Sequence, residues 1–143
     1  MIIRNICKND LPQLARLYEQ FWGDKSYPEL MARQLEELER RDTHILLVAV
    51  EDDDLLGSVM GIVCEELYGD CRPFLVVENM IVDKACRRAG VGRALLAELE
   101  NRAKARGCTQ MILVTEKSRQ DACGFYESVG FEPDKHTGYK KKL

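Results

Sequence analysis

The sequence has little of what marks zinc-binding, secreted or membrane proteins. It holds only two histidines, and none of its six cysteines stands at Cys-x-x-Cys spacing from another, so we expect no metal site. No apolar run approaches the roughly 20 residues that span a bilayer, and the N-terminus has no apolar signal-peptide region. We therefore expect a soluble, cytoplasmic protein with reduced thiols and no membrane partner.

Repeats, low-complexity segments and linkers are also missing. Hydrophobic residues make up 45% and charged residues 31% of the 143 residues, which is ordinary for a globular protein. The length fits a single domain, residues 1–143. The net charge of −3 does not favour nucleic acid as a partner, although a local basic cluster can still bind an anion.

Hydrophobic periodicity and turn residues predict the element order β-α-α-β-β-β-α-β-α-β-β, an α/β (α+β) fold around a mixed sheet. The predicted strands are 1–6, 44–51, 55–67, 74–83 and 109–116, followed by a closing hairpin near 130–140. The predicted helices run from Asn9 or Asp10 to Gly23, from Pro28 to Arg40, from the 87–92 turn to Gly107, and from a Ser118 cap to Gly130. Gly57 and Gly61 are predicted to mark bulges or close contacts.

The segment after the most apolar strand carries the clearest chemical signal. There the chain reads Arg-Arg-Ala-Gly-Val-Gly from Arg87 to Gly92 and then opens a helix. Helix N-termini present unpaired N–H groups and a positive dipole end, which together bind phosphate oxygens. Lys84, Arg87, Arg88 and Arg93 concentrate positive charge at the same point of an acidic chain. The turn is therefore predicted to bind a phosphate, although a glycine turn with solvated arginines has the same pattern.

Two known phosphate-binding fingerprints do not fit this turn. A dinucleotide-binding fingerprint needs a third glycine where Leu95 stands, and a P-loop needs Gly-Lys-Ser/Thr, which the chain lacks. The spacing Arg87-x-x-Gly90-x-Gly92 instead resembles the Arg/Gln-x-x-Gly-x-Gly/Ala motif of the GNAT superfamily of acetyl-CoA-dependent N-acetyltransferases. Downstream, Ala122-Cys-Gly-Phe-Tyr-Glu-Ser-Val-Gly-Phe131 is similar to that family's Ala-x-x-Phe-Tyr-Glu-x-x-Gly-Phe segment.

The resemblance implies a mostly antiparallel sheet flanked by about four helices, with the strand at 74–82 splayed from the next one to admit acetyl-CoA. It implies that main-chain groups of Met80, Ile81 and Val82 bind the pantetheine and the acetyl carbonyl. It further implies that the pyrophosphate is held by Arg87, Arg88, Ala89, Gly90, Val91, Gly92, Arg93 and Ala94. Arg119 stands where many members of the family have an asparagine that contacts the cofactor. The arginine is expected either to reach a phosphate of coenzyme A or to leave that contact unmade.

Transfer of an acetyl group to an amine needs a neutral amine and a protonated leaving thiol. Tyr126 matches the family's usual general acid, although its place on an apolar helix stripe also suits a core aromatic. Glu78 is the candidate general base, because a carboxylate inside an apolar strand is expected to have a raised pKa. A paired or exposed carboxylate is the competing interpretation, and Glu116 is the second candidate base.

The resemblance places the acceptor amine near Trp22 and Tyr27, where aromatic rings suit a cation unless they simply pack. The prediction is an N-acetyltransferase that acts by direct attack in a ternary complex, on a small cationic amine or a protein amine. The alternative is a non-catalytic coenzyme A or acyl-CoA-binding regulatory module, which would keep Arg87–Gly92 without depending on Tyr126. The sequence leaves a homodimer open.

Overall fold

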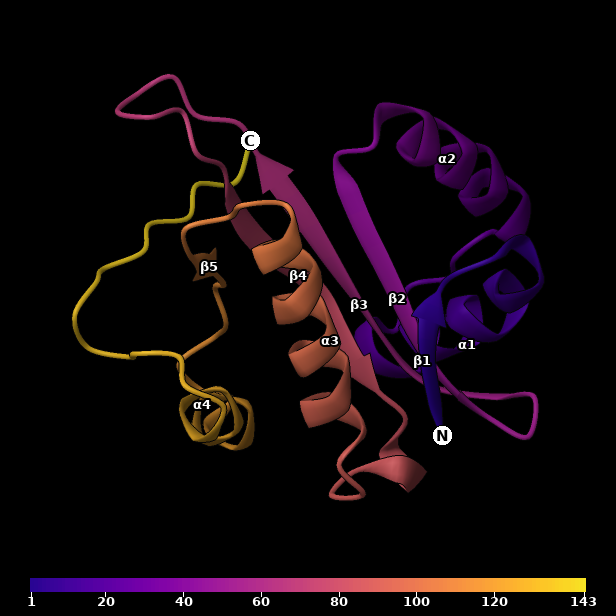
Figure 1. Cartoon of the computed structure of the whole chain (residues 1–143). Coiled ribbons are helices and arrows are strands. Elements are labelled where there is room, and N and C mark those ends of the chain that lie inside the picture. Colours follow the sequence, from indigo (N-terminus) through magenta and orange to yellow (C-terminus); the bar gives the residue numbers. More distant parts are fainter. The chain divides into compact units, whose positions relative to one another are not determined.

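The structure is a computed structural model that describes residues 1–143 (Figure 1). Clustering of the chain gives two compact units, residues 1–112 and residues 113–143, which are described separately. The first unit contains the sheet and helices α1, α2 and α3, and the second contains helix α4. No helix is long and apolar enough to cross a membrane.

The sheet has five strands in the order β1-β2-β3-β4-β5. The strands are β1 (Ile2–Asn5), β2 (His44–Glu51), β3 (Asp54–Cys64), β4 (Phe74–Val82) and β5 (Met111–Ile112). The helices are α1 (Leu11–Trp22), α2 (Pro28–Arg41), α3 (Val91–Ala105) and α4 (Gln120–Ser128), with short 3-10 turns η1 (Lys8–Asp10) and η2 (Lys84–Cys86). All neighbouring strands are antiparallel except β4 and β5, which are parallel. The predicted fold class is therefore confirmed.

Helices cover both faces of the sheet (Figure 1). On one face α3 packs so closely on β3 that an added Cβ at Gly61 would lie 2.7 Å from the Leu99 side chain. On the other face α1 and α2 bury Leu14 and Leu35 in a cluster with Val48 of β2 and Ile81 of β4. The apolar stripe of α1 and the alternation along the strands account for this two-sided core.

Gly57 of β3 is required by a close main-chain approach, as its place in a strand predicted. A Cβ at this position would lie 2.7 Å from the carbonyl oxygen of Ile81. We expect Gly57→Ala to lower the free energy of unfolding by about 1–3 kcal/mol, because main chain rather than a side-chain tip must move. Gly124→Ala in α4 is the matched control, since nothing lies within 4 Å of its added Cβ. Urea unfolding of both variants checks this, and equal stabilities would contradict it.

An ion pair between a partly exposed guanidinium and a buried carboxylate joins β1 to the start of α1. Asp10 is 6% exposed and receives two hydrogen bonds from the Arg4 guanidinium, at 2.7 and 2.8 Å, and one from the Cys7 N–H at 2.7 Å. Burial opposes ionisation, but the bonds from Arg4 and Cys7 outweigh it and hold the pKa of Asp10 below its usual value. The pair therefore stabilises the fold at every pH at which Asp10 is ionised.

We expect Asp10→Asn to lower the free energy of unfolding by about 1.5–3 kcal/mol at pH 7, because charged hydrogen bonds are lost. Since the folded pKa is the lower one, the contribution of Asp10 is complete above its unfolded pKa of about 3.9 and disappears as pH falls below that value. Urea titrations between about pH 2 and 7 should therefore show wild type and variant converging in acid. Glu100→Gln, which removes an exposed pair with Lys104, is the control and should cost under about 0.5 kcal/mol.

Four local predictions are wrong. β3 ends at Cys64 rather than residue 67, because β4 begins opposite Cys64 and residues 65–73 form the connection. The predicted strand at 109–116 is reduced to β5, since only Leu75 and Val76 of β4 pair with it. Arg119, not Ser118, precedes α4, and no side chain caps that helix. The closing hairpin is absent, because residues 131–143 form no strand and residues 132–143 are exposed.

Candidate active site

A β-bulge interrupts the ladder between β3 and β4 where Glu78 and Asn79 break the apolar pattern. Met60 pairs with Glu78 but Ser58 pairs with Ile81, so β4 has one residue more than β3 between these pairs. Asn79 has φ 49°, the left-handed conformation that asparagine tolerates better than most residues. Such bulges re-aim side chains and free main-chain groups, and they are common beside active sites.

The edge of β4 away from β3 is open along its second half. Pairing with β5 covers only Leu75 and Val76. The Asp83 N–H donates to the Leu56 carbonyl at 2.8 Å, so the alternation of the antiparallel ladder directs the main-chain groups of Ile81 toward β3 and those of Val82 toward the open edge. Met80 lies within the bulge. The strand edge at Met80 and Val82 is thus unpaired. The main-chain groups of Ile81, in contrast, face β3 within the sheet.

Beyond this edge the chain turns into the N-terminus of α3. The Asp83 carboxylate accepts from the Ala85 N–H at 2.8 Å and fixes η2. Arg88 and Gly90 then adopt positive φ angles of 67° and 83°. Gly90 precedes the helix, no side chain caps it, and nothing lies within 4 Å of where its Cβ would be. The first N–H groups of α3, at Val91 and Gly92, therefore have no acceptor within the helix.

Positive side chains surround this helix start. Lys84, Arg87, Arg88 and Arg93 are all exposed, as is Ala89, and Ala94 donates the first helical hydrogen bond, to the Gly90 carbonyl at 3.0 Å. Helix amides and a local excess of cations thus lie together at the turn for which the sequence predicts an anion site. A diphosphate fits these donors, because Gly90 leaves the approach to the main chain open.

Comparisons with known proteins agree with this geometry. The family model described as "Acetyltransferase (GNAT) family" matches residues 11–131. The chain belongs to the GNAT acetyltransferase family. It is therefore an acyltransferase.

The individual relatives are acetyltransferases as well. An acetyltransferase of Pectobacterium atrosepticum is 28% identical over 137 residues, which cover 92% of this chain and 88% of that protein. The L-methionine sulfoximine/L-methionine sulfone acetyltransferase of Pseudomonas paraeruginosa is 30% identical over 142 residues, which cover 91% of this chain and 79% of that protein. The structure of glucosamine-6-phosphate N-acetyltransferase from Arabidopsis thaliana has a TM-score of 0.85 at 21% identity, over 98% of this chain and 97% of that one, and so shows the shared fold.

In this acetyltransferase the predicted general acid lies on α4, in the second unit. The half-buried Tyr126 ring lies 5.3 Å from the Phe125 ring and 5.9 Å from the Phe131 ring, between centroids. The Phe131 N–H donates to the Tyr126 carbonyl at 3.1 Å. The Tyr126 ring thus packs against Phe125 and Phe131, and its role as general acid stays a prediction.

The other predicted residues of the second unit lie just before α4. Arg119 is exposed, and its guanidinium lies 3.5 Å from the Thr115 hydroxyl, close enough to donate a hydrogen bond. Glu116, the second candidate base, is exposed, and its carbonyl accepts from the Arg119 N–H at 3.0 Å. Arg119 and Glu116 therefore belong to one turn ahead of α4.

Glu78 differs from expectation in its surroundings. Its side chain is exposed and projects to the face of the sheet that carries α1, opposite Met60. Glu78 is therefore not buried, contrary to the expectation from its place in an apolar strand.

The two predicted acceptor residues are both about half exposed, Trp22 at 47% and Tyr27 at 52%. Trp22 makes edge contacts with Tyr18 at 5.2 Å and Phe21 at 4.8 Å, between ring centroids. The Lys25 ammonium lies 5.6 Å from the Tyr27 ring centroid. Tyr27 thus already has a cation at its ring within the chain, which weakens the case for a cationic acceptor there.

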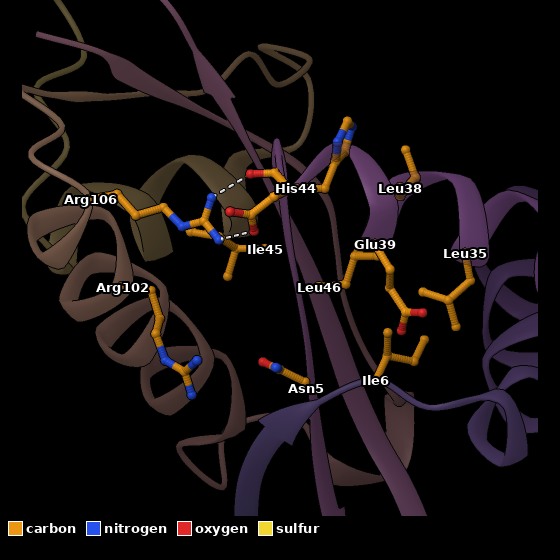
Figure 2. Close-up of a pocket in the computed structure, with 11 residues that line it drawn as sticks. Asn5, Ile6, Leu35, Leu38, Glu39, His44, Ile45, Leu46, Arg102 and Arg106 are labelled. Carbon is orange, nitrogen blue, oxygen red and sulfur yellow. Dashed lines mark hydrogen bonds and ion pairs between the residues drawn. The ribbon is translucent and has the colours of Figure 1, made fainter.

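Two shallow hollows of the first unit are lined by none of the predicted site residues. One, of about 340 Å³, is lined by Arg16 of α1, Asp54 of β3 and Cys86 of η2. The other, of about 200 Å³, lies between α2, the start of β2 and the end of α3 (Figure 2). There the Arg106 guanidinium donates to the carbonyl and carboxylate of Asp42, at 2.5 and 2.6 Å. This pairing joins α3 to the end of α2, and we assign the space no part in the reaction.

Sequence reasoning missed one polar contact beside the bulge. The Tyr18 side chain of α1 lies near the buried Ser58 of β3, the residue that pairs with Ile81. Burial raises the pKa of Tyr18, and the nearby Ser58 hydroxyl offsets part of that effect. The only signal in the sequence was a tyrosine on an otherwise apolar helix stripe.

Proposed function

We propose that this acetyltransferase transfers the acetyl group of acetyl-CoA to a primary amine by direct attack, and that residues 1–143 act as one domain. The observation that carries the proposal is the N-terminus of α3, which no side chain caps and which follows the open edge of β4 after η2. The family match across residues 11–131 includes parts of both units and supports their acting together. Acetyl-CoA, when bound, supplies a thioester carbonyl that an amine can attack.

On the cofactor side, the amides of Val91, Gly92 and Arg93 would hold the pyrophosphate, with Arg87 and Arg88 adding charge. The main-chain groups of Met80 and Val82, at the open edge, would hold the pantetheine and polarise the carbonyl. A fixed N–H at a developing oxyanion is worth about 3–4 kcal/mol where such donors have been removed. Ile81 would act indirectly, by fixing the bulge through β3. Arg119 would add a contact to a coenzyme A phosphate.

On the acceptor side, Glu78 would take a proton from the ammonium, and Tyr126 would give one to the departing thiolate. An alkylammonium has a pKa near 10.4 and a thiol near 8.5, so both transfers favour reaction near neutral pH. Trp22 would border the acceptor with its exposed edge, and Tyr27, already paired with Lys25, would contribute less. A reducing compartment, the cytoplasm, suits the six free cysteines.

A thiol-release assay with acetyl-CoA and a panel of primary amines tests this function. We expect coenzyme A to appear faster with at least one amine than without enzyme, together with a stoichiometric acetamide product. The alternative, a non-catalytic acyl-CoA-binding module, is not favoured by N-acetyltransferase relatives. Tight binding of coenzyme A with no turnover of any amine would overturn the proposal in favour of that module.

We expect Glu78→Gln to lower kcat/KM about 10²-fold, the lower end for a general base, because the exposed carboxyl can be partly replaced by water. The loss should be greatest below the pKa of the amine and should shrink as pH rises and more free amine is present. Glu65→Gln, an exposed acid beyond the end of β3, is the control. A large loss in Glu116→Gln with an unchanged Glu78→Gln would transfer the role to Glu116.

A further inference from the structure

We propose that the acceptor carries its amine on an apolar body, an alkyl or aryl chain, that lies on Met60, Ile62 and Val76 beside Glu78. This inference rests on the proposed function and names the substrate class for the same site. It is carried by the residues that β3 and β4 present on the face of α1.

The register fixes which side chains share this face. Ser58, Met60 and Ile62 alternate along β3, and Ser58 contacts Tyr18 of α1, so all three point to the α1 side. Their partners on β4 are Ile81, Glu78 and Val76. Directly opposite residues in an antiparallel pair have Cβ atoms about 4.5–5.5 Å apart, so Glu78 adjoins Met60 and Val76 adjoins Ile62. The candidate base thus stands at one end of an apolar strip.

Burial shows that this strip is partly exposed while the opposite face is closed. Leu75 and Val77 of β4 and Val63 of β3 point to the α3 side and are at most 8% exposed. Met60, Ile62 and Val76, in the same two strands, are only half-buried. Since α1 and α2 bury the cluster around Val48 and Ile81, the strip begins where their cover ends.

The polar groups near the strip favour an apolar amine over a sugar amine. Ser58, the polar residue of β3 on this face, is 5% exposed, so its hydroxyl is not offered to an acceptor. Glu78 lies at one end of the strip and suits one ammonium, and His44 of β2 lies opposite Ile62. Hydroxyls laid on Met60, Ile62 and Val76 would lose hydrogen bonds to water without replacement. Methylene groups there are removed from water, which favours binding by about fourfold each.

The test compares n-hexylamine, ethylamine, 2-(2-aminoethoxy)ethanol and glucosamine as acceptors at fixed acetyl-CoA. The first and third have the same number of heavy atoms and differ in polarity. We expect kcat/KM to rise about fourfold per methylene from ethylamine to n-hexylamine. We expect n-hexylamine to exceed the ether alcohol and glucosamine by at least about tenfold.

Substitutions on the strip test whether its side chains cause the preference for n-hexylamine over the ether alcohol. Ile62→Thr should reduce the preference for n-hexylamine over the ether alcohol by about fivefold or more, because one wall becomes polar. Ile2→Thr makes the same change on the edge strand β1, at a side chain 67% exposed, and should leave the preference unchanged. Val76→Thr, which keeps the side-chain shape, repeats the test if Ile62→Thr lowers the unfolding midpoint.

The outcomes separate this inference from the proposed function. Equal or better use of glucosamine or the ether alcohol, or a preference that Ile62→Thr and Val76→Thr leave unchanged, would overturn the inference while the transfer reaction stands. Turnover of no amine would contradict the proposed function. In that case the inference is tested by calorimetry on the protein with coenzyme A bound. The affinity for N-hexylacetamide is compared with the affinity for the acetamide of the ether alcohol. Tighter binding of N-hexylacetamide supports it, and equal or weaker binding overturns it.

Discussion

Gly92→Glu is expected to weaken the binding of coenzyme A by about 100-fold or more. The second residue of α3 lies among the N–H groups that we assign to the pyrophosphate. A carboxylate there opposes the phosphates at short range and fills the approach to the main chain. Like charges in contact cost several kcal/mol, and each 1.4 kcal/mol is a factor of ten in affinity.

The same substitution should not unfold the protein. Glutamate is a better helix former than glycine, and its charge is favourable at a helix N-terminus. Ala105→Glu adds the same charge at the exposed end of α3, about 20 Å away along the helix, and is the matched control. Calorimetry with coenzyme A measures both variants. Wild-type affinity in Gly92→Glu would remove the phosphate assignment.

Tyr126→Phe is expected to lower kcat by about 10²–10⁴-fold while the affinity for coenzyme A stays within about threefold of wild type. The ring packs against Phe125 and Phe131, so the variant should keep the packing and lose only the hydroxyl. Without a proton donor the thiolate must leave unprotonated. The loss should therefore be smaller for acyl donors whose thiol has a lower pKa.

Tyr139→Phe is the control for this prediction, because it removes the same hydroxyl from a side chain that is 94% exposed. Its kcat should equal that of the wild type. A Tyr126→Phe variant with wild-type kcat would make Tyr126 a packing residue, the other interpretation that its helix position allows. A loss that is the same for every thiol leaving group would argue against proton donation.

Elements with strong local signals could be predicted from the sequence. Pro28 at the start of α2 and the apolar run from Ile45 to Val50 gave helix and strand boundaries within one residue of those observed. The phosphate turn was equally local, since Gly90 and the neighbouring cations are all within ten residues of one another. These features depend on local backbone geometry and charge, which the residues of one short segment determine.

Features that depend on a partner strand could not be predicted. The bulge at Asn79 is a mismatch between β3 and β4, and neither strand alone shows it. The segment around Met111 has good strand formers but only two partners on β4. The contact of Tyr18 with Ser58 joins residues 40 positions apart, and it became visible only once α1 was packed on β3.

The amide resonances of Val91, Gly92 and Arg93 test the central claim most directly. In a ¹⁵N-labelled sample titrated with coenzyme A, these three resonances should shift far more than those of the exposed end of α3 near Ala105. Inorganic pyrophosphate should shift the same three at higher concentration. Saturation with coenzyme A that moves other resonances and leaves these three in place would contradict the account.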